Sequence, residues 1–214
     1  MKNSDRYAIP GNENYEPGSS DTVLKNYLQI TSKEKIEHIE AIELRRAELE
    51  LAELVKQNQT LTARDICNFH ELWLGDIYAF AGQYRTVNMS KSGFPFAAPT
   101  LIPTLMQTFE VDFLKRYTPC HEQEHDVLAD VLGKTHAELI IIHPFREGNG
   151  RLARLLANLM ALQANMPPLN YTSIDQTTNP EGFDRYIKAI HTAFAGDTHA
   201  IQQIFSKLLE DSIN

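Results

Sequence analysis

The chain has 214 residues, of which 43% are hydrophobic and 22% charged. That length allows one well-buried core, and the composition is ordinary for a soluble globular domain. Lys and Arg number 20 against 28 Asp and Glu, so the net charge is −8 and a duplex nucleic-acid partner is disfavoured. The first twenty residues lack an apolar stretch that could form a signal or spanning segment, so no membrane partner is expected. The only cysteines, Cys67 and Cys120, favour a reducing cytoplasm.

The N-terminal part of the chain divides into an arm and a helical region. Residues 1–22 are polar and rich in Pro, Gly and Ser, which predicts an arm that is ordered by docking. Residues 23–60 are expected to form leading helices. Their predicted apolar stripe has three- and four-residue spacing and consists of Leu44, Ala47, Leu51, Leu54 and Val55.

A further helix is expected to open at Thr62, because Asp65 three residues later makes a capping box. We expect Gly82 to stop it. Its aromatic side chains recur at helical spacing, which is typical of core packing rather than of a cofactor site. The predicted stripe consists of Ile66, Phe69, Trp73, Ile77 and Phe80.

Residues 84–98 break the helical period. Val87 and Met89 alternate with polar residues, a Ser-Gly turn follows, and Phe94 and Phe96 alternate again, which predicts a short β-hairpin. The expected fold class is therefore all-α with one hairpin. Helical patterns resume over residues 101–116, 127–142, 151–164, 183–195 and 198–209.

A loop suited to phosphate binding precedes the helix predicted over 151–164. Gly148 and Gly150 flank Asn149, and both glycines permit positive φ, so successive N–H groups can point into one concavity. The unpaired N–H groups and the dipole of the following helix favour an anion at the same place.

Charged side chains surround this loop. Arg151 and Arg154 share a helix face and can fork onto phosphate oxygens. Glu147 is placed to hold Mg²⁺ that bridges two phosphates. His143, fixed at a helix end before Pro144, can take a proton from an incoming hydroxyl. Each residue alone has a structural explanation, but their conjunction predicts a nucleotide and magnesium site.

Residues 143–154 read His-Pro-Phe-Arg-Glu-Gly-Asn-Gly-Arg-Leu-Ala-Arg. They match without interruption the signature of the Fic family, His-Pro-Phe-x-(Asp/Glu)-Gly-Asn-Gly-Arg-x-x-Arg. Residues 84–98 resemble the family's flap hairpin, and residues 24–48 resemble its leading helices. The arm resembles that of bacterial Fic proteins, with a Leu-x-Asn-x-Leu stretch at 24–28. The resemblance implies the Fic (Fido) helical fold, with the catalytic domain over 61–210.

The resemblance also implies an activity, the transfer of AMP from ATP onto a Tyr, Thr or Ser hydroxyl of another protein with release of pyrophosphate. By similarity His143 deprotonates that hydroxyl and Glu147 binds Mg²⁺. The implied nucleotide-binding set comprises Lys91 and Ser92 on the flap, Phe145 as the loop anchor, Gly148, Asn149, Gly150, Arg151 and Arg154 around the phosphates, and Asn170 and Tyr171 near adenine and ribose.

Two protein partners are expected from the resemblance. The target segment would pair as a strand with the flap. Many Fic proteins are silenced by a helix reading (Ser/Thr)-x-x-x-Glu-(Gly/Asn), whose Glu pairs with the second arginine, here Arg154. Residues 177–182 match it literally, but Pro180 and Gly182 indicate capping of the 183–195 helix. Because Ser206 and Glu210 fall on a core helix and Asp211 follows, the inhibitory Glu is expected to come from a separate small antitoxin.

Three alternatives stay open. His121-Glu122-x-x-His125 is a literal zinc-protease motif, but it follows Thr118-Pro119 and is expected in an exposed first helical turn, where zinc binding is a remote reading. A Fic-like binding module without chemistry is disfavoured by the intact signature. Transfer of UMP or phosphate is the third alternative, and the intact Gly150 favours AMP over phosphate.

Overall fold

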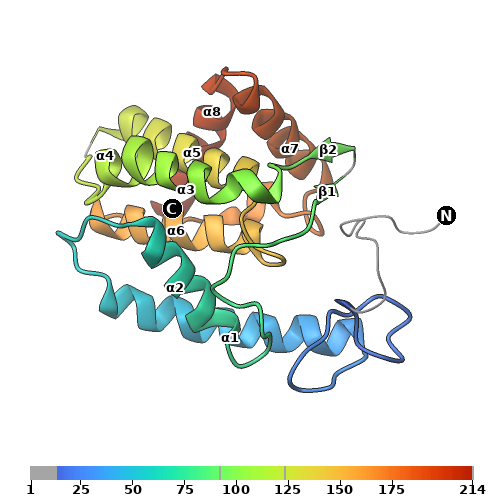
Figure 1. Ribbon diagram of the computed structural model, residues 1–214. Coiled ribbons are helices and arrows are strands. Elements are labelled where there is room, and N and C mark those ends of the chain that lie inside the picture. The colour runs from blue at the N-terminus through green and yellow to red at the C-terminus, as the bar shows by residue number, and fades with distance from the viewer. Residues whose placement is uncertain (1–13, 92, 123, 214) are drawn as a thin grey trace.

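The computed structural model describes residues 14–91, 93–122 and 124–213. It confirms the all-α class with one hairpin (Figure 1). The longer helices are α1 (Lys33–Leu54), α2 (Ala63–Leu74), α3 (Ile102–Phe109), α5 (His125–Ile142), α6 (Asn149–Gln163), α7 (Pro180–Phe194) and α8 (His199–Ile213). The shorter elements are β1 (Ser90–Lys91), β2 (Phe94–Pro95), the 3-10 helices η2 (Pro99–Leu101) and η4 (Tyr171–Ile174), the π-helix η3 (Glu110–Leu114), and α4 (Lys115–Tyr117).

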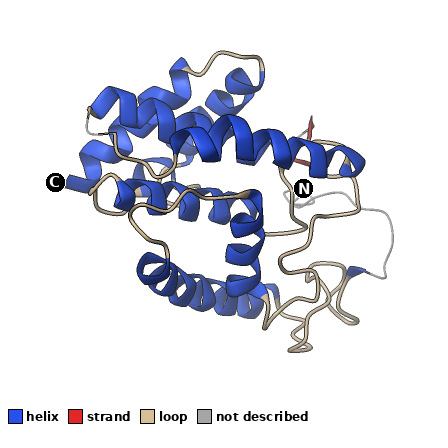
Figure 2. Cartoon of the chain, turned by 60° about the vertical axis from the view of Figure 1, so that its left-hand side comes forward, coloured by secondary structure: helices blue, strands red, loops and turns tan. Residues whose placement is uncertain are grey.

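The helix α5 lies at the centre of the fold. It contacts α3, α6, α7 and α8. Consecutive residues over 128–133 are almost all buried, so every face of this helix is covered. In Figure 1, α1 follows the lower edge and α7 and α8 lie at the top, and in Figure 2 the hairpin lies at one end of the helical stack. No helix among the described residues has the length and apolarity needed to cross a membrane.

The described part of the N-terminal arm, residues 14–22, packs onto the domain. Tyr15 forms an isolated antiparallel bridge with Leu24. The Asn26 side chain is buried and bonds the main chain of Leu24 and Ile30, which explains the polar residue inside the predicted Leu-x-Asn-x-Leu stretch. The arm boundary at 22 and the domain limits at 61 and 210 remain predictions.

Within residues 23–60 the structure has one helix, α1, where several leading helices were expected. Ser32 caps it by accepting from the Lys35 N–H. Its buried face consists of Ile36, Glu40, Ala47 and Leu51, whereas Leu54 is 55% exposed. The predicted stripe is therefore wrong at Leu54 and missed a buried carboxylate, because apolar periodicity cannot detect a polar residue in the core.

The helix α2 begins with the predicted capping box, in which Thr62 and Asp65 bond each other's main-chain N–H. It ends at Leu74 rather than before Gly82, which corrects the expected length. The Gly75 N–H closes the last turn on the Glu71 carbonyl, and the chain then folds back. Ile77 is buried beyond the helix end, so an apolar residue in helical register does not prove that the helix continues.

The hairpin is shorter than the alternation predicted. β1 and β2 pair antiparallel with Ser90 opposite Pro95 and Lys91 opposite Phe94. The expected 101–116 helix is divided into α3, η3 and α4, and the other helices begin or end a few residues beyond their predicted limits.

Candidate active site

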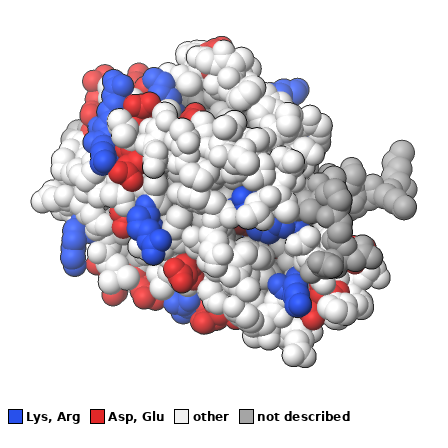
Figure 3. All heavy atoms as spheres, viewed as in Figure 1, with Lys and Arg blue, Asp and Glu red and all other residues white. Residues whose placement is uncertain are grey.

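A cleft of about 1110 Å³ lies between the flap (residues 84–98), α7, the start of α6 and the N-terminal segment. His143, Glu147 and Gly148 line it from the loop between α5 and α6. Arg151 and Arg154 line it from α6. On the face drawn in Figure 3, basic side chains lie near the centre. The cleft therefore collects the residues of the 143–154 segment around one cavity.

The loop before α6 is closed by a single side chain. The Asn149 Oδ1 accepts from the Phe145 N–H at 2.8 Å, and its Nδ2 donates to the Phe145 carbonyl at 2.8 Å. Phe145 is fully buried, so it anchors the loop in the core and does not line the cleft. Gly148 is the N-cap of α6 with φ 79, which leaves the first N–H groups of a 15-residue helix directed at the cleft end.

His70 on α2 supports the same loop, and the sequence analysis did not identify it. Its ring stacks on Phe145 at 4.0 Å. Nδ1 accepts from the Gly82 N–H at 2.9 Å, so the proton resides on Nε2, which donates to the Glu147 carbonyl at 3.1 Å. Burial lowers the pKa of His70 to about 4, which keeps the ring neutral and this bonding pattern fixed.

His143 caps α5 in the left-handed conformation, with φ 52. Its Nδ1 lies 3.0 Å from the Ile140 carbonyl, an arrangement that requires the proton on Nδ1 and makes Nε2 the ring nitrogen that carries the lone pair. The ring stacks on Phe96 of the flap at 3.7 Å. Burial lowers the pKa of His143 to about 3, so the imidazole is neutral at physiological pH.

Arg85, at the start of the flap, joins the flap to the His143 loop. Its guanidinium donates to the carbonyls of His143 (2.7 Å), Val87 (2.6 Å) and Ala97 (2.6 Å). Its main-chain N–H bonds the Pro144 carbonyl at 2.9 Å. A buried arginine that satisfies main-chain carbonyls on both segments holds them in register. Sequence reasoning missed it because its partners are distant along the chain.

Arg151 and Arg154 share the cleft-facing side of α6, as their spacing predicted. The Arg151 guanidinium lies 4.6 Å above the Trp73 ring and donates to Glu40 at 2.7 Å. The Arg154 guanidinium lies 5.1 Å from the Tyr171 ring. Both cations rest on aromatic faces, which restricts their motion while their charge is presented to the cleft.

Glu147 offers the one carboxylate in the phosphate loop, and it suits a hard cation. Its Oε1 accepts from the Gly148 N–H at 3.0 Å. Within the described part of the chain there is no group of three or more His, Cys, Asp or Glu that could hold a metal. A metal at Glu147 would therefore complete its shell with phosphate and water oxygens, which is the way Mg²⁺ binds.

Replacing Gly148 tests how closely the loop is packed. A Cβ at Gly148 would lie 2.6 Å from the Trp73 ring, and its φ of 79 disfavours any other residue. We expect Gly148→Ala to lower the free energy of unfolding by about 2–4 kcal/mol in urea denaturation. Gly150→Ala is the matched control, because its Cβ meets no atom within 4 Å and alanine favours a helix. Equal stabilities of the two variants would contradict this packing.

Of the other residues predicted to contact the nucleotide, some line the cleft and others do not. Lys91 lines the cleft. Ser92 lies outside the described residues. Asn170 and Tyr171 are not among the cleft-lining residues: Asn170 caps η4, and the Tyr171 hydroxyl bonds the Arg154 carbonyl at 3.1 Å from beneath α6. Their loop folds under the arginine helix, which a Pro-Pro-Leu-Asn-Tyr sequence could not reveal.

Of the described residues in the zinc-protease motif, His121 and Glu122 precede the helix and His125 is the first residue of α5. α5 begins only at His125, with Glu124 as its N-cap, so Thr118-Pro119 does not start a helix as expected. The buried Thr118 hydroxyl instead accepts from the Leu61 N–H and donates to the Leu114 carbonyl, which ties this segment to the end of η3 and to the residues before α2. His125 lies 2.9 Å from the Ser206 hydroxyl. The arrangement does not support a helical zinc site.

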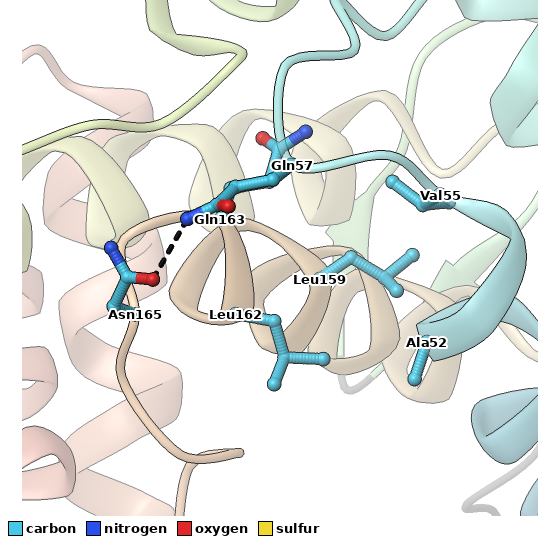
Figure 4. A pocket seen from close by; sticks show the side chains of 7 residues that line it. All are labelled: Ala52, Val55, Gln57, Leu159, Leu162, Gln163 and Asn165. Atoms are coloured by element: carbon cyan, nitrogen blue, oxygen red, sulfur yellow. Dashed lines mark hydrogen bonds between the residues drawn. The ribbon is translucent and has the colours of Figure 1, made fainter.

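A smaller hollow of about 330 Å³ lies between the ends of α1 and α6 (Figure 4). Its wall combines aliphatic side chains with amides, and the Gln57 amide donates to the Asn165 side chain at 2.7 Å. No charged residue or histidine lines it. The larger cleft is therefore the candidate active site.

The cleft thus brings together an imidazole, the start of a helix, two arginines and a carboxylate that suits a hard cation. Residues 60–161 match the model of the Fic/DOC family.

Two curated relatives are animal proteins. Protein adenylyltransferase Fic of Nematostella vectensis is 30% identical over 149 residues, covering 69% of this chain and 34% of the relative. Protein adenylyltransferase fic-1 of Caenorhabditis elegans is 28% identical over 212 residues, covering 96% of this chain and 39% of the relative. The chain therefore spans little more than a third of these proteins. The predicted likeness of the arm to bacterial Fic proteins gains no support from them.

Two solved structures share the fold. BepC, a VirB-translocated effector protein from Bartonella tribocorum, was crystallised with bound AMPPNP, with a TM-score of 0.72 and 18% identity over 91% of this chain and 95% of that one. Fic-1 of C. elegans has a TM-score of 0.63 and 27% identity over 83% of this chain and 50% of that one.

Proposed function

We propose that this chain is a protein adenylyltransferase, which transfers AMP from ATP to a Tyr, Thr or Ser hydroxyl of another protein. The observation that carries this proposal is the presence in one cleft of a neutral imidazole, His143, and the N-terminus of α6 with Arg151 and Arg154. The names of the curated relatives and the AMPPNP in BepC support the choice of ATP. The cytoplasm is the proposed location, since it supplies ATP.

In the proposed reaction the target hydroxyl oxygen attacks the α-phosphorus of ATP. Its proton passes to Nε2 of His143, the ring nitrogen that does not face the Ile140 carbonyl. The bond from the α-phosphorus to the bridging oxygen breaks, and pyrophosphate leaves with the electron pair. The N–H groups at the start of α6 and the two arginines stabilise the charge that develops on the phosphates.

Glu147 is the residue proposed to hold Mg²⁺. When bound there, the ion would neutralise part of the phosphate charge and assist departure of pyrophosphate. The chain's own contribution is orientation, because the carboxylate is fixed by the Gly148 N–H at the mouth of the anion loop.

The adenine base is proposed to rest on α7. Since Asn170 and Tyr171 lie away from the cleft, its apolar wall comes from Phe183, Ile187 and Ile190. Apolar walls with a few polar groups are typical of nucleotide-base pockets.

The flap is the proposed docking site for the target. Phe94 of β2 stacks on His191 of α7 at 4.7 Å, and Arg85 fixes the flap's base, so the short hairpin is held at both ends. A target loop added as a strand would bring its hydroxyl toward the stacked His143 ring.

A separate small antitoxin is the proposed source of inhibition. The matching segment 177–182 forms the cap of α7, with the Asn179 side chain accepting from the Gly182 N–H. Ser206 and Glu210 lie on α8, which packs on α5. Among the described residues no carboxylate lies within 4 Å of the Arg154 guanidinium, so a partner could offer one there.

Arg154 provides the test of this function. We expect the wild-type chain, incubated with ATP, Mg²⁺ and cell-extract proteins, to yield AMP adducts on hydroxyl side chains in mass spectra. Arg154→Ala should weaken binding of a non-hydrolysable ATP analogue by about 10–100-fold and remove the adducts, because a charge-assisted phosphate contact is lost. Its melting temperature should stay within a few degrees of wild type.

Arg154→Lys is the matched control, since it keeps the charge and loses the fork. It should bind the analogue with intermediate affinity. Adducts from Arg154→Ala at the wild-type level would show that this arginine does not serve the nucleotide.

A further inference from the structure

Glu40 is a carboxylate buried to 1% exposure on the core-facing side of α1. Burying a charge is costly unless it is paired and hydrogen-bonded. Here the Tyr78 hydroxyl donates to Oε1 at 2.5 Å, and Arg151 donates to Oε2 at 2.7 Å. The Glu40 carbonyl accepts from the Trp73 indole at 2.9 Å. Two segments distant in sequence, residues 73–78 and the start of α6, thus converge on one residue of α1.

Arg151 lies between two carboxylates. Its Nη2 is 2.7 Å from Glu40 Oε2 but 3.4 Å from Glu147 Oε1. The first distance is that of a strong charge-assisted bond, and the second is long. The Trp73 ring beneath the guanidinium, at 4.6 Å, further restricts its position. Glu40 therefore holds the guanidinium at the α1 side of the cleft, so that its contact with Glu147 stays the longer of the two.

We propose that Glu40 is a positioning residue that keeps Arg151 from closing on Glu147, and so leaves the Glu147 carboxylate available to Mg²⁺. Without Glu40, the nearest carboxylate to Arg151 among the described residues is Glu147, which already lies 3.4 Å from the guanidinium and could close on it. Their pairing would occupy a metal-binding oxygen and turn the guanidinium from the phosphates. The proposal rests on the proposed nucleotide site. It implies that Mg²⁺ affinity at Glu147 depends on the packing of α1 against α6.

The test is the affinity for AMPPNP measured by calorimetry, with Mg²⁺ and with EDTA in its place. The ratio of the two dissociation constants reports how much the metal tightens binding, without requiring any transfer. Loss of a group that orients a metal ligand typically lowers metal affinity by about 10–100-fold. Glu40→Gln should therefore reduce this ratio at least fivefold. Glu43→Gln, one turn along α1 and paired with Arg46, should leave it within twofold of wild type.

A double-mutant comparison separates positioning from general damage. In an Arg151→Ala background Glu40→Gln should leave the ratio unchanged, because no guanidinium remains to move onto Glu147. Tyr78→Phe removes one hydrogen bond to Glu40 and should lower the ratio by two- to threefold. This variant replaces Glu40→Gln in the test if Glu40→Gln does not fold. An unchanged ratio in the folded single variants, or an equal loss in the Arg151→Ala background, would overturn the proposal.

The outcome is separable from that of the proposed function. If the wild-type chain binds AMPPNP more tightly with Mg²⁺ but transfers no AMP, the function fails while the role of Glu40 can still be measured. If Mg²⁺ does not tighten binding by the wild-type chain, the role of Glu40 is refuted whatever the transfer assay shows.

Discussion

His143→Ala should lower the rate of AMP transfer by about two to four orders of magnitude while leaving nucleotide affinity within about threefold. In the proposed reaction the imidazole receives the hydroxyl proton, whereas the phosphates are bound by α6 and its arginines. With Nδ1 directed at the Ile140 carbonyl, only Nε2 can accept, so no other nitrogen of this residue can replace it. Single-turnover rates and analogue binding together measure both effects.

Because the backbone at His143 is left-handed, a second substitution is needed to separate loss of the base from a shift of the loop. With φ 52, alanine there would be strained by about 1–2 kcal/mol, and the loop could shift for reasons unrelated to catalysis. His143→Asn tolerates this conformation, and its amide cannot accept a proton at neutral pH. Both variants should be equally inactive. Near-normal transfer by His143→Asn would refute the general base.

Acidification from pH 7 to pH 5 should lower the free energy of unfolding by an amount on the order of 6 kcal/mol. Burial lowers the pKa of His70 to about 4 and of His136 and His143 to about 3, against an ordinary value of 6.5. Below pH 6.5 the unfolded chain binds protons that the folded chain does not, so stability falls as pH falls toward the folded pKa values. Each histidine contributes about 2 kcal/mol at pH 5.

Urea denaturation at stepped pH measures this loss, and it is comparable with the total stability of many domains. Near pH 5 the slope should correspond to about three protons taken up on unfolding. His136→Gln should remove about one of them. Stability that is constant between pH 7 and pH 5 would show that these histidines are not buried as neutral rings.

Local signals predicted much of the fold. The Thr62 and Asp65 capping box marked the start of α2 because it acts within one turn. The Gly-Asn-Gly loop and the spacing of the arginines placed the phosphate site for the same reason. The end of α2 was missed because turns after Gly75, and not the apolar period, redirect the chain.

The supporting residues could not be predicted, since their partners are far away in sequence. Glu40 meets Arg151 across 111 positions, Arg85 meets His143 across 58, and His70 meets Glu147 across 77. Each is a polar residue buried in the core, which no helical or strand period marks. For Tyr171 the sequence predicted a nucleotide contact that the structure does not have. Its ring lies under Arg154 instead of in the cleft.

The most direct test of the central claim is transfer of label from ATP labelled at either the α- or the γ-phosphate, with target proteins from a cell extract. AMP transfer predicts label on protein from α-labelled ATP and none from γ-labelled ATP, with both signals absent for His143→Asn. Label from the γ-phosphate would indicate phosphate transfer. Absence of label from either position, in a chain that binds AMPPNP, would contradict the account and leave a nucleotide-binding module without this chemistry.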